Sequence, residues 1–364
     1  MKKHIKNKLS IIIPTYNEAE NIVNLLNEIL VELHNFNFEI IVVDDGSEDL
    51  TAEIIIKNFQ ENDKIKLIRR RLDKGLLQSI KLGLQTISGT AFLVMDGDGQ
   101  HDPKDIPGII DLLENNDLVI GVRDLSKTQI ISRMRINLSR FFNFLTNLVL
   151  QQKISDPLTG FFAGKINLLN QKFFSINNSG FKILLDLIYA NKNGLNNISE
   201  KIINFRARRK GVSKLKAHVF FSFSTQLISY LFGGLISSKF IGFAIIGGFG
   251  FVLHFLMMFY LFKTTALTFI LIHSISTLVA ATANYTLNNY LNFYENNFKN
   301  NKNFLFGLLK YYLINIPSIL ASLGGASFAY NILTSSPYIA SLTGIIFDTI
   351  FKYALSINWI WKSK

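Results

Sequence analysis

The arginines and acidic residues of this chain are confined almost entirely to its first part, and this asymmetry limits the possible folds more than any single motif. After Lys210 the sequence has no arginine, and Glu295 and Asp348 are its only acidic residues. Four apolar segments lie in this second part, at about 240–262, 266–289, 305–330 and 338–360. Each segment is long enough to span a bilayer. The sequence therefore predicts a soluble domain followed by an all-α, four-helix transmembrane domain.

Much of the excess positive charge lies beside the apolar segments. The net charge is +12, but the lysines flank spans instead of forming a basic recognition helix, so we expect anionic lipid and phosphorylated substrates and no nucleic-acid partner. Lysines occur before the first span, between the second and third, and at the chain end: Lys239, Lys299, Lys302, Lys362 and Lys364. The positive-inside rule then predicts an integral protein of the cell membrane with the first domain and both termini in the cytoplasm.

The first part alternates between short apolar runs and helical patterns. The expected strands are Leu9–Ile13, Glu39–Val43, Lys64–Ile68, Ala91–Met95 and Leu118–Val122. The expected helices are Asn17–Leu33, Leu50–Phe59 and Gly75–Ile87. This alternation predicts a mostly parallel α/β sheet covered by helices on both faces. The apolar run Leu9–Ile13 is too short for a signal-peptide core, so we expect this domain to remain in the cytoplasm.

Polar clusters follow three of the expected strands, at Pro14–Glu18, Asp44–Ser47 and Asp96–Gln100. Ligands of open α/β sheets bind at the carboxyl ends of the strands, so the three clusters together predict a nucleotide pocket. In it, Tyr16 can stack on a base and Asp45 can accept a hydrogen bond from a base or ribose. Taken singly, each cluster is also compatible with a turn or a helix N-cap.

The sequence Asp96-Gly97-Asp98 is the most informative of these clusters. Two carboxylates at the end of a buried strand are costly unless positive charge lies beside them. A hard divalent cation that bridges a diphosphate is the usual reason for such a pair, with Gln100 and His101 near enough to complete the site. The alternative is an acidic turn after a strand.

Over about residues 8–215 the chain resembles family-2 glycosyltransferases. The motifs are IIIPTYNEAENI, EIIVVDDGSEDLT, DGDGQHDP, SDPLTGFF and RARRKGVSKL. The resemblance is narrower to dolichyl- or polyprenyl-phosphate mannosyltransferases. It implies that residues 1–215 form a GT-A domain, which is Rossmann-like with a mostly parallel sheet.

The resemblance also implies roles for single residues. Nucleotide-sugar contacts fall on Pro14, Tyr16, Glu18, Val43, Asp45, Asp96, Gly97, Asp98, Arg208 and Lys214. Asp98 and Gln100, with Asp96 close by, match the ligands of Mg²⁺ or Mn²⁺. Family members often have alanine where Gly97 stands. We expect His101 to support the ligands or the fold instead of binding the metal.

Several arginines match family positions that contact phosphates. Arg123 follows a strand and matches an arginine near the diphosphate, and Arg133 and Arg140 lie in the basic amphipathic stretch Ser132–Leu150. The resemblance makes Asp98, Arg123 and Arg140 catalytic, and makes Arg123, Arg133 and Arg140 ligands of the lipid phosphate. The stretch also suits a membrane interface or an ordinary core helix. The basic segment Arg206–Lys214 also suits attraction to anionic lipid.

Residues 216–238 are expected to form interfacial amphipathic helices, and residues 239–364 resemble the GtrA-like membrane domain. The resemblance rests on KFIGFAIIGGFGFVLHF and NYTLNNYLNF. The small-residue runs 247–250 and 324–326 permit close helix packing. Asp348 and Lys352 are one turn apart in the fourth span, so they form a local ion pair or carry a function. The sequence leaves open whether the chain forms a homo-oligomer.

These features predict transfer of one hexose from a nucleotide diphosphate sugar to polyprenyl or dolichyl phosphate at the cytoplasmic membrane face, with a divalent metal. The resemblance implies inversion and favours mannose from GDP-mannose. UDP-glucose as donor, or a lipid-linked sugar transporter or flippase, are the alternatives. A processive polysaccharide synthase is disfavoured because Trp359 and Trp361, the only tryptophans, do not stand in a Q-x-x-R-W motif.

Overall fold

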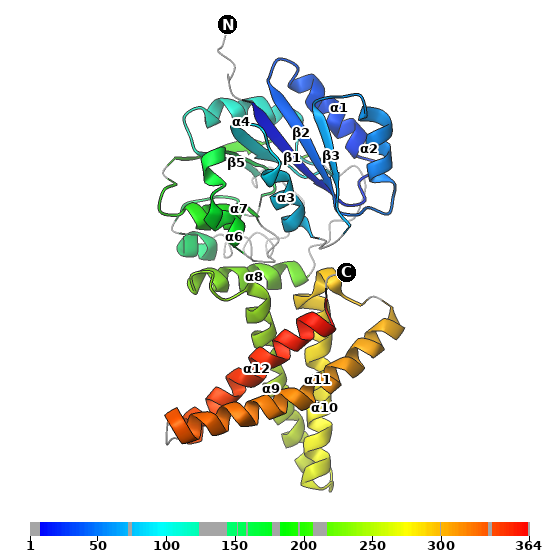
Figure 1. Ribbon diagram of the computed structural model, residues 1–364, viewed down its shortest axis with the longest axis vertical. Helices are drawn as coiled ribbons and strands as arrows, with labels where there is room; N and C mark the ends of the chain where they lie inside the picture. The colour runs from blue at the N-terminus through cyan, green and yellow to red at the C-terminus, as the bar shows by residue number, and fades with distance from the viewer. Residues whose placement is uncertain are drawn as a thin grey trace. The chain divides into compact units, whose positions relative to one another are not determined.

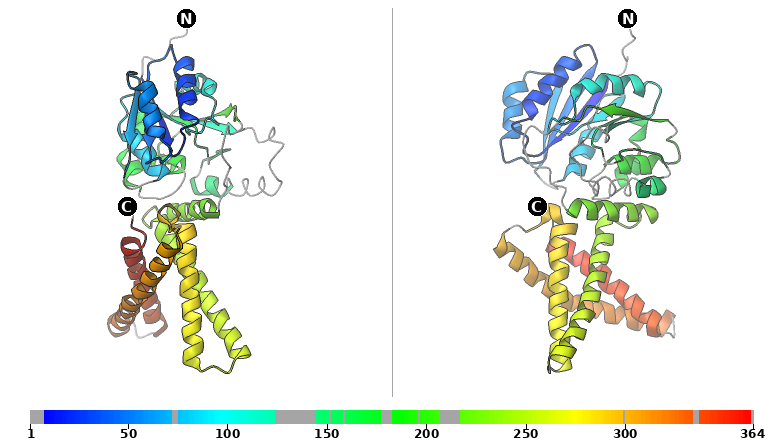
Figure 2. Two further views of the ribbon diagram at one scale, coloured as in Figure 1. Left: turned by 90° about the vertical axis from the view of Figure 1, so that its right-hand side faces the viewer. Right: turned by 180° about the vertical axis from the view of Figure 1, so that it is seen from behind.

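The chain forms two compact units, Met1–Lys214 and Leu215–Lys364. The structure is a computed structural model, drawn in Figures 1 and 2. It describes residues 8–71, 75–123, 144–150, 152–157, 159–176, 183–195, 197–206, 217–298, 300–333 and 337–362.

The first unit is built on a seven-stranded sheet with the order β3-β2-β1-β4-β6-β5-β7. The strands are β1 Leu9–Thr15, β2 Phe38–Asp44, β3 Ile65–Arg69, β4 Ala91–Val94, β5 Leu118–Arg123, β6 Phe162–Lys165 and β7 Ile198–Ile203. Only β6 is antiparallel to its neighbours, β4 and β5. The predicted mostly parallel α/β fold is therefore confirmed, and its arrangement is GT-A-like.

Helices cover both faces of this sheet. They are α1 Ile22–Glu32, α2 Thr51–Phe59, α3 Leu76–Gln85, α4 Ile106–Leu113, α6 Gln171–Ser175 and α7 Ile183–Asn191. Ile11 and Ile13 of β1 join a buried core with α1, α2 and α4, whereas Ile12 lies against α3. At Gly83 of α3 an added Cβ would approach the Ile12 side chain to 2.7 Å, so glycine is required for this close packing. Every residue of β1 and β2 is buried, as the continuous apolar runs of both strands require.

The helix expected over Asn17–Leu33 begins only at Ile22. Asn17 has a φ of 58°, in the left-handed region, and so turns the chain before the helix. The next two backbone N–H groups are used by the neighbouring loop, since those of Glu18 and Ala19 donate to Thr51 and Asp49. Residues 17–21 are thus a connection that fixes the end of β1 to the loop after β2. The predicted helix was therefore about five residues too long at its N-terminal end.

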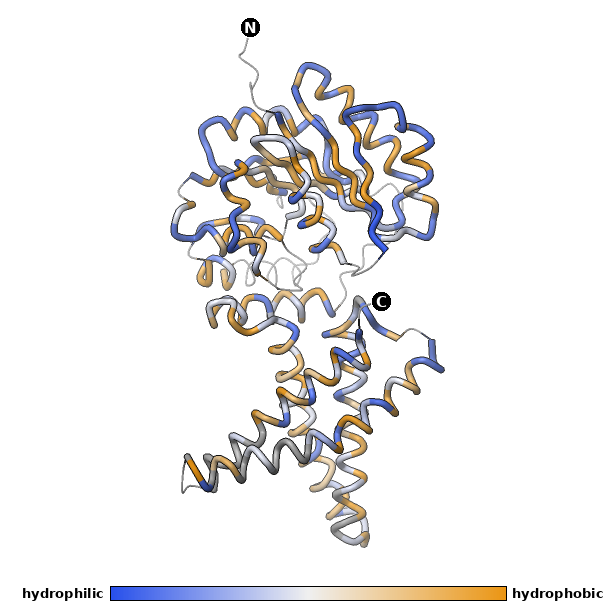
Figure 3. The backbone as a smooth tube through the Cα atoms, viewed as in Figure 1, coloured by the Kyte–Doolittle hydropathy of each residue, from blue (hydrophilic) through white to orange (hydrophobic). Residues whose placement is uncertain are grey.

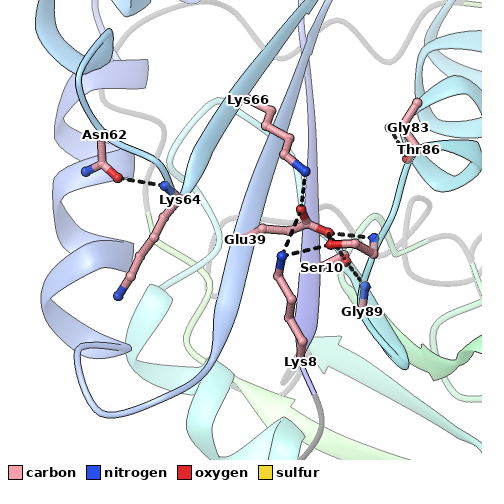
Figure 4. Close-up of polar contacts among 10 residues, drawn as sticks. Lys8, Ser10, Glu39, Asn62, Lys64, Lys66, Gly83, Thr86 and Gly89 are labelled. Atoms are coloured by element: carbon pink, nitrogen blue, oxygen red, sulfur yellow. Dashed lines mark hydrogen bonds and ion pairs between the residues drawn. The ribbon is translucent and has the colours of Figure 1, made fainter.

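Glu39 forms a buried polar cluster near the start of β2, away from the carboxyl ends of the strands (Figure 4). Its carboxylate accepts hydrogen bonds from Ser10 Oγ at 2.6 Å, Ser88 N at 2.7 Å and Lys66 Nζ at 2.7 Å, and Lys8 Nζ lies 3.3 Å away. Burial alone would raise the pKa of Glu39, but the hydrogen bonds from Lys66, Ser10 and Ser88 outweigh it and lower that pKa. The cluster joins β1, β2, β3 and the loop before β4.

The second unit is helical. Its elements are α8 Ala217–Leu231, α9 Ser238–Thr264, α10 Phe269–Leu287, α11 Asn301–Phe328 and α12 Pro337–Trp359, with π-helical turns at Asn288–Asn292 and Ala329–Leu333. Helices α9 and α10 form one hairpin and α11 and α12 another (Figure 1). Figure 3 shows hydrophobic residues along these helices and along the central strands of the first unit. Residues 216–238 were expected to form interfacial amphipathic helices. In the described part of this range the structure has the helix α8 followed by a turn, and its position at an interface stays a prediction.

One helix stands out by length and composition. Among the described helices, α9 alone is long and apolar enough to cross a membrane by these criteria, with a mean hydropathy of 2.1 in its most apolar window. The other three segments expected to span are also helical. The expected number of four spans stays a prediction.

Two glycine–asparagine contacts set the register of the α9–α10 hairpin. A Cβ at Gly242 would collide with the side chain of Asn292, and one at Gly250 would collide with Asn284. Asn292 Nδ2 also donates to the Lys239 carbonyl at 2.9 Å. Gly242 and Gly250 are separated by about two turns of α9, and Asn284 of α10 and Asn292 of the following π-helical turn are separated by the same number of residues, so the pairs match in an antiparallel hairpin.

Replacing Gly250 with valine should destabilise this hairpin by about 1–3 kcal/mol, because the new side chain would displace the Asn284 side chain from its place against α9. The matched control is Gly247→Val, since a Cβ at Gly247 meets nothing within 4 Å in the described part of the chain. Thermal unfolding of the two variants in detergent compares them. Equal melting temperatures would contradict the proposed register.

Candidate active site

A pocket of about 370 Å³ opens at the carboxyl ends of β1, β2 and β4. It is lined by Pro14, Thr15, Tyr16, Glu18, Asp45, Leu76, Ser79, Asp96, Gly97 and Asp98. The structure therefore brings the three predicted polar clusters together in one cavity. Val43 is the exception among the described residues expected to contact the nucleotide sugar, because it is fully buried within β2 and does not line the pocket.

The first two clusters are tied to each other. Asn17 N donates to Ser47 Oγ at 2.9 Å, and Glu48 N donates to Asn17 Oδ1 at 2.9 Å. Asp44 accepts from the backbone N–H of Ser47 at 3.1 Å, which closes the turn. Tyr16, with 49% of its surface exposed, is left at the pocket where its ring can stack on a flat ligand.

Asp45 is held by the protein on both carboxylate oxygens. Oδ1 accepts from Arg70 Nη1 at 2.6 Å and from Ser79 Oγ at 3.1 Å, and Oδ2 accepts from the backbone N–H of Gly75 at 2.7 Å. The Asp45 and Arg70 side chains are only 12% and 8% exposed. The predicted contact to a base or ribose stays a prediction, and the described partners make Asp45 the group that anchors the start of α3 beside the pocket.

The acidic loop, residues 96–105, follows β4 and presents two carboxylates. The Asp96 side chain is 42% exposed, and both Asp96 and Asp98 line the pocket. Asp98 Oδ1 accepts from the backbone N–H of Gln100 at 3.1 Å, and Gly99 takes a φ of +73° that glycine adopts readily. The Gln100 side chain donates to the Arg206 carbonyl at 3.5 Å and does not line the pocket, so its role as a ligand stays a prediction.

His101 is buried and contacts Asp96, and its expected supporting role stays a prediction. Its Nε2 is 3.3 Å from Asp96 Oδ2, and its ring stacks on Phe161 with centroids 4.9 Å apart. Asp96 also lies against Gly160, where an added Cβ would approach Asp96 Oδ2 to 2.6 Å. The SDPLTGFF motif therefore supports the acidic loop directly.

Arg123 ends β5 beside the acidic loop. Its Nε donates to Asp156 Oδ2 at 2.7 Å and its Nη2 to Asp156 Oδ1 at 3.0 Å, a two-point pair that fixes the plane of the guanidinium. The ring of Phe205 lies 5.5 Å from the guanidinium carbon. Burial alone would lower the pKa of Arg123, but its pair with Asp156 and the charge of Asp96 raise it, so the group is permanently cationic.

Removing the carboxylate that orients Arg123 should impair binding of a phosphate. For the acceptor that the resemblance implies, polyprenyl phosphate, we expect Asp156→Ala to raise the KM about tenfold, because a misplaced charged group loses roughly 1–2 kcal/mol of interaction. Steady-state kinetics with varied acceptor measure this change. The control is Asp117→Ala, which removes the partner of Lys165 elsewhere in the sheet. An unchanged acceptor KM in Asp156→Ala would show that Arg123 does not need this orientation.

The remaining predicted cationic residues, Arg133, Arg140, Arg208 and Lys214, lie outside the described residues. Part of the stretch that contains Arg133 and Arg140 is described, and it is a short helix over residues 144–150. Phe144 and Leu148, one turn apart, are exposed on that helix. An exposed apolar pair of this kind suits the expected membrane interface.

The donor set of the pocket fits a hard divalent cation. Within the described ranges, no three Asp, Glu, His or Cys side chains gather to hold a metal by themselves. Mg²⁺ does not require such a cage, because it is usually bound by one or two carboxylates together with waters and substrate phosphates. Asp96 and Asp98 would hold the cation, and a diphosphate in the same pocket would complete its coordination.

The sheet order, with antiparallel β6 inserted between β4 and β5, and the acidic loop at the pocket define a GT-A-like glycosyltransferase domain. Comparison with family models makes the assignment specific. Residues 10–173 match Glycosyl transferase family 2, and residues 242–361 match the GtrA/DPMS transmembrane domain. The chain therefore carries a family-2 glycosyltransferase domain followed by a GtrA/DPMS transmembrane domain, and the second domain makes it a membrane protein.

Curated relatives include two dolichol-phosphate mannosyltransferases. The one from Pyrococcus furiosus is 35% identical over 221 residues, which are 59% of this chain and 61% of the relative. The one from Mycosarcoma maydis is 29% identical over 231 residues, 60% of this chain and 77% of the relative. The match thus spans less than two thirds of the archaeal relative.

Among solved structures, the chain is similar to glucosyl-3-phosphoglycerate synthase from Mycobacterium tuberculosis. The complex with Mg²⁺ and UDP shows 19% identity and a TM-score of 0.45, over 63% of this chain and 79% of the other. The complex with Mn²⁺, UDP and phosphoglyceric acid has a TM-score of 0.46 and 19% identity, over 63% of this chain and 78% of the other.

Proposed function

We propose that the protein transfers a single hexose from a nucleotide diphosphate sugar to a polyprenyl or dolichyl phosphate at the cytoplasmic face of the cell membrane. The observation that supports this most is the pocket in which Asp96 and Asp98 meet Tyr16 and Glu18. This pocket belongs to a chain that continues into a GtrA/DPMS transmembrane domain. A membrane-bound chain with a nucleotide-sugar pocket suits an acceptor that is itself a lipid.

Mannose from GDP-mannose is the proposed donor. Two relatives at 35% and 29% identity are named dolichol-phosphate mannosyltransferases, which supports mannose. A third, from Photorhabdus laumondii, is an undecaprenyl-phosphate 4-deoxy-4-formamido-L-arabinose transferase, 32% identical over 130 residues, which are 35% of this chain and 40% of that relative. The acceptor class, a polyprenyl phosphate, is thus shared among relatives that differ in sugar. UDP-glucose remains the alternative donor.

The proposed reaction is a direct displacement. An oxygen of the acceptor phosphate attacks the anomeric carbon, the bond from that carbon to the diphosphate oxygen breaks, and the nucleoside diphosphate leaves with inversion. The attacking phosphate is already anionic near neutral pH, so the protein needs no strong general base. Catalysis is then mainly positioning and electrostatic stabilisation.

The residues of the candidate site have separate tasks in this scheme. Tyr16, Asp45 and Ser79 line the part of the pocket that suits the nucleoside. Arg123, which Asp156 orients, binds and directs a phosphate. Asp96 and Asp98 hold the divalent cation, which when bound neutralises charge on the leaving diphosphate. Arg208 and Lys214 are proposed to contact the donor phosphates, and Arg133 and Arg140 the lipid phosphate.

A radiolabel transfer assay on the purified chain in detergent tests the proposal. Polyprenyl phosphate and Mg²⁺ or Mn²⁺ are incubated with labelled GDP-mannose or, separately, labelled UDP-glucose. Label in the lipid phase from GDP-mannose, dependent on both metal and acceptor, is the expected result. Label only from UDP-glucose would correct the donor. No label from either donor, together with movement of a labelled lipid-linked sugar across vesicles in a separate assay of the reconstituted chain, would favour the transport alternative.

A further inference from the structure

Three residues that follow β7, Asn204, Phe205 and Arg206, run beside the acidic loop. Asn204 N donates to Asp105 Oδ2 at 2.8 Å, and Phe205 forms an isolated antiparallel bridge with His101. Arg206 N then donates to the Gln100 carbonyl at 2.8 Å. This exit segment, Asn204–Arg206, therefore holds the loop along its length, from Gln100 to Asp105.

The Arg206 side chain extends this connection to a helix. Its Nη1 donates to Glu28 Oε2 at 2.5 Å and its Nη2 to Asp102 Oδ1 at 2.5 Å. Glu28 lies on α1, which is packed into the core of the sheet through Leu25 and Ile29. One guanidinium thus joins the acidic loop to a rigid helix by two charge-assisted hydrogen bonds, which a single ammonium group cannot reproduce in the same plane.

The contacts continue from Asp102 toward the carboxylates that line the pocket. Asp102 Oδ1 also accepts from Lys104 N at 3.0 Å and so begins the turn Pro103–Asp105. On the other side, Gln100 N donates to Asp98 Oδ1 at 3.1 Å. A displacement of Asp102 would therefore be transmitted through Gln100 to Asp98.

We propose that Arg206 is a positioning residue for the divalent cation. By fastening the segment 100–102 to α1, it fixes the loop so that Asp96 and Asp98 present their carboxylates to one ion. Side chains that orient metal ligands typically change metal affinity by roughly 10–100-fold when they are removed. The inference rests on the proposed function only in taking Asp96 and Asp98 as the ligands of the cation.

The test is a titration of the full chain in detergent with Mn²⁺ alone, with free Mn²⁺ measured by electron paramagnetic resonance. Arg206→Gln should raise the Kd for Mn²⁺ about tenfold. Glu28→Gln should also raise the Kd for Mn²⁺, but by less, although Glu28 belongs to α1 and is not part of the acidic loop. The Kd of Arg206→Lys should lie between those of Arg206→Gln and the parent. The matched control is Arg69→Gln, which breaks an arginine–glutamate pair with Glu53 at 2.7 Å. The control should bind Mn²⁺ like the parent.

Melting temperatures of the same samples separate positioning from a merely structural role. If Arg206→Gln and Glu28→Gln lower the melting temperature but leave the Kd for Mn²⁺ unchanged, the proposal is wrong. An equal rise of the Kd in Arg69→Gln would also overturn it, because the effect would not be specific to this connection. Sugar transfer is not read in this titration, so a wrong donor sugar leaves the inference intact. A parent chain without saturable Mn²⁺ binding would overturn it.

Discussion

Replacing Asp98 with alanine should lower kcat/KM for sugar transfer about a thousandfold. Asp98 lines the pocket beside Asp96, and the pair is the described carboxylate set that fits a divalent cation. Losing the cation removes several kcal/mol of charge stabilisation from the leaving diphosphate, and each ~1.4 kcal/mol is a factor of about ten in rate. Asp98→Asn, which keeps the size but not the charge, should lose most of the same activity.

The radiolabel assay measures this effect, and two controls accompany it. Asp111→Asn removes an exposed carboxylate from α4 and should leave activity unchanged. Chelating the divalent cation from the parent enzyme should reproduce the loss seen in Asp98→Ala. Full activity in Asp98→Ala, or an enzyme that is indifferent to chelation, would contradict the metal-dependent mechanism.

Replacing Glu39 with glutamine should destabilise the first unit by about 2–3 kcal/mol. The Glu39 side chain is 2% exposed, so its partners lose a buried acceptor that carries charge. A neutral amide keeps one acceptor oxygen but offers donors where Lys66, Ser10 and Ser88 require an acceptor. Lys8 and Lys66 are partly exposed, so solvent screens their attraction to Glu39. The expected loss of stability is therefore smaller than for a fully buried ion pair that loses one partner.

Native-state hydrogen exchange on the full chain measures this loss, through the protection of amides in β1 and β2. The control Glu53→Gln breaks the exposed pair with Arg69 and should change protection by less than about 0.5 kcal/mol. Equal protection in Glu39→Gln and the parent would show that the cluster is not stabilising. Activity measured under stabilising conditions should be nearly unchanged, since Glu39 lies near the start of β2 and the pocket lies at the strand ends.

The contribution of Glu39 also predicts a pH dependence. The folded protein lowers the pKa of Glu39, whereas the unfolded chain titrates it near ~4.3. The carboxylate therefore contributes its full stability above about pH 5, and this contribution is lost as the pH falls through the lowered folded pKa. The difference in protection between the parent and Glu39→Gln should be constant near neutral pH and shrink below about pH 4. A constant difference down to that range would contradict the lowered pKa.

The first five strands were predictable because each is a short apolar run between turn signals, but the last two were not. β6 has four residues, Phe162–Lys165, and β7, ISEKII, carries two charged residues. Both are strands because of long-range pairing: β6 pairs with β4 and β5 across the chain, and β7 pairs with β5. The position of an antiparallel strand between two parallel ones depends on such pairing and leaves no local pattern in the sequence.

The candidate site was predictable where polar residues follow strands directly. Tyr16, Asp45, Asp96 and Asp98 are of this kind, and the sheet brings them to one pocket. Other site residues were missed because their function depends on a distant partner. Arg70 pairs with Asp45 from within a run of three arginines that has the pattern of a solvated charged surface. Ser79 likewise has a partner that only the folded chain brings close. Asp156 and Arg206 lie in motifs that the sequence did indicate, but their partners could not be read from it.

The most direct test of the proposed function is mass spectrometry of the lipid product made by the purified chain. The chain in detergent is given polyprenyl phosphate, a divalent cation and GDP-mannose, and the lipid extract is analysed before and after mild acid hydrolysis. The proposal predicts polyprenyl phosphate that carries one hexosyl group through an acid-labile phosphodiester, absent from Asp98→Ala. Products with several hexoses, or unmodified polyprenyl phosphate with every nucleotide sugar tested, would contradict it.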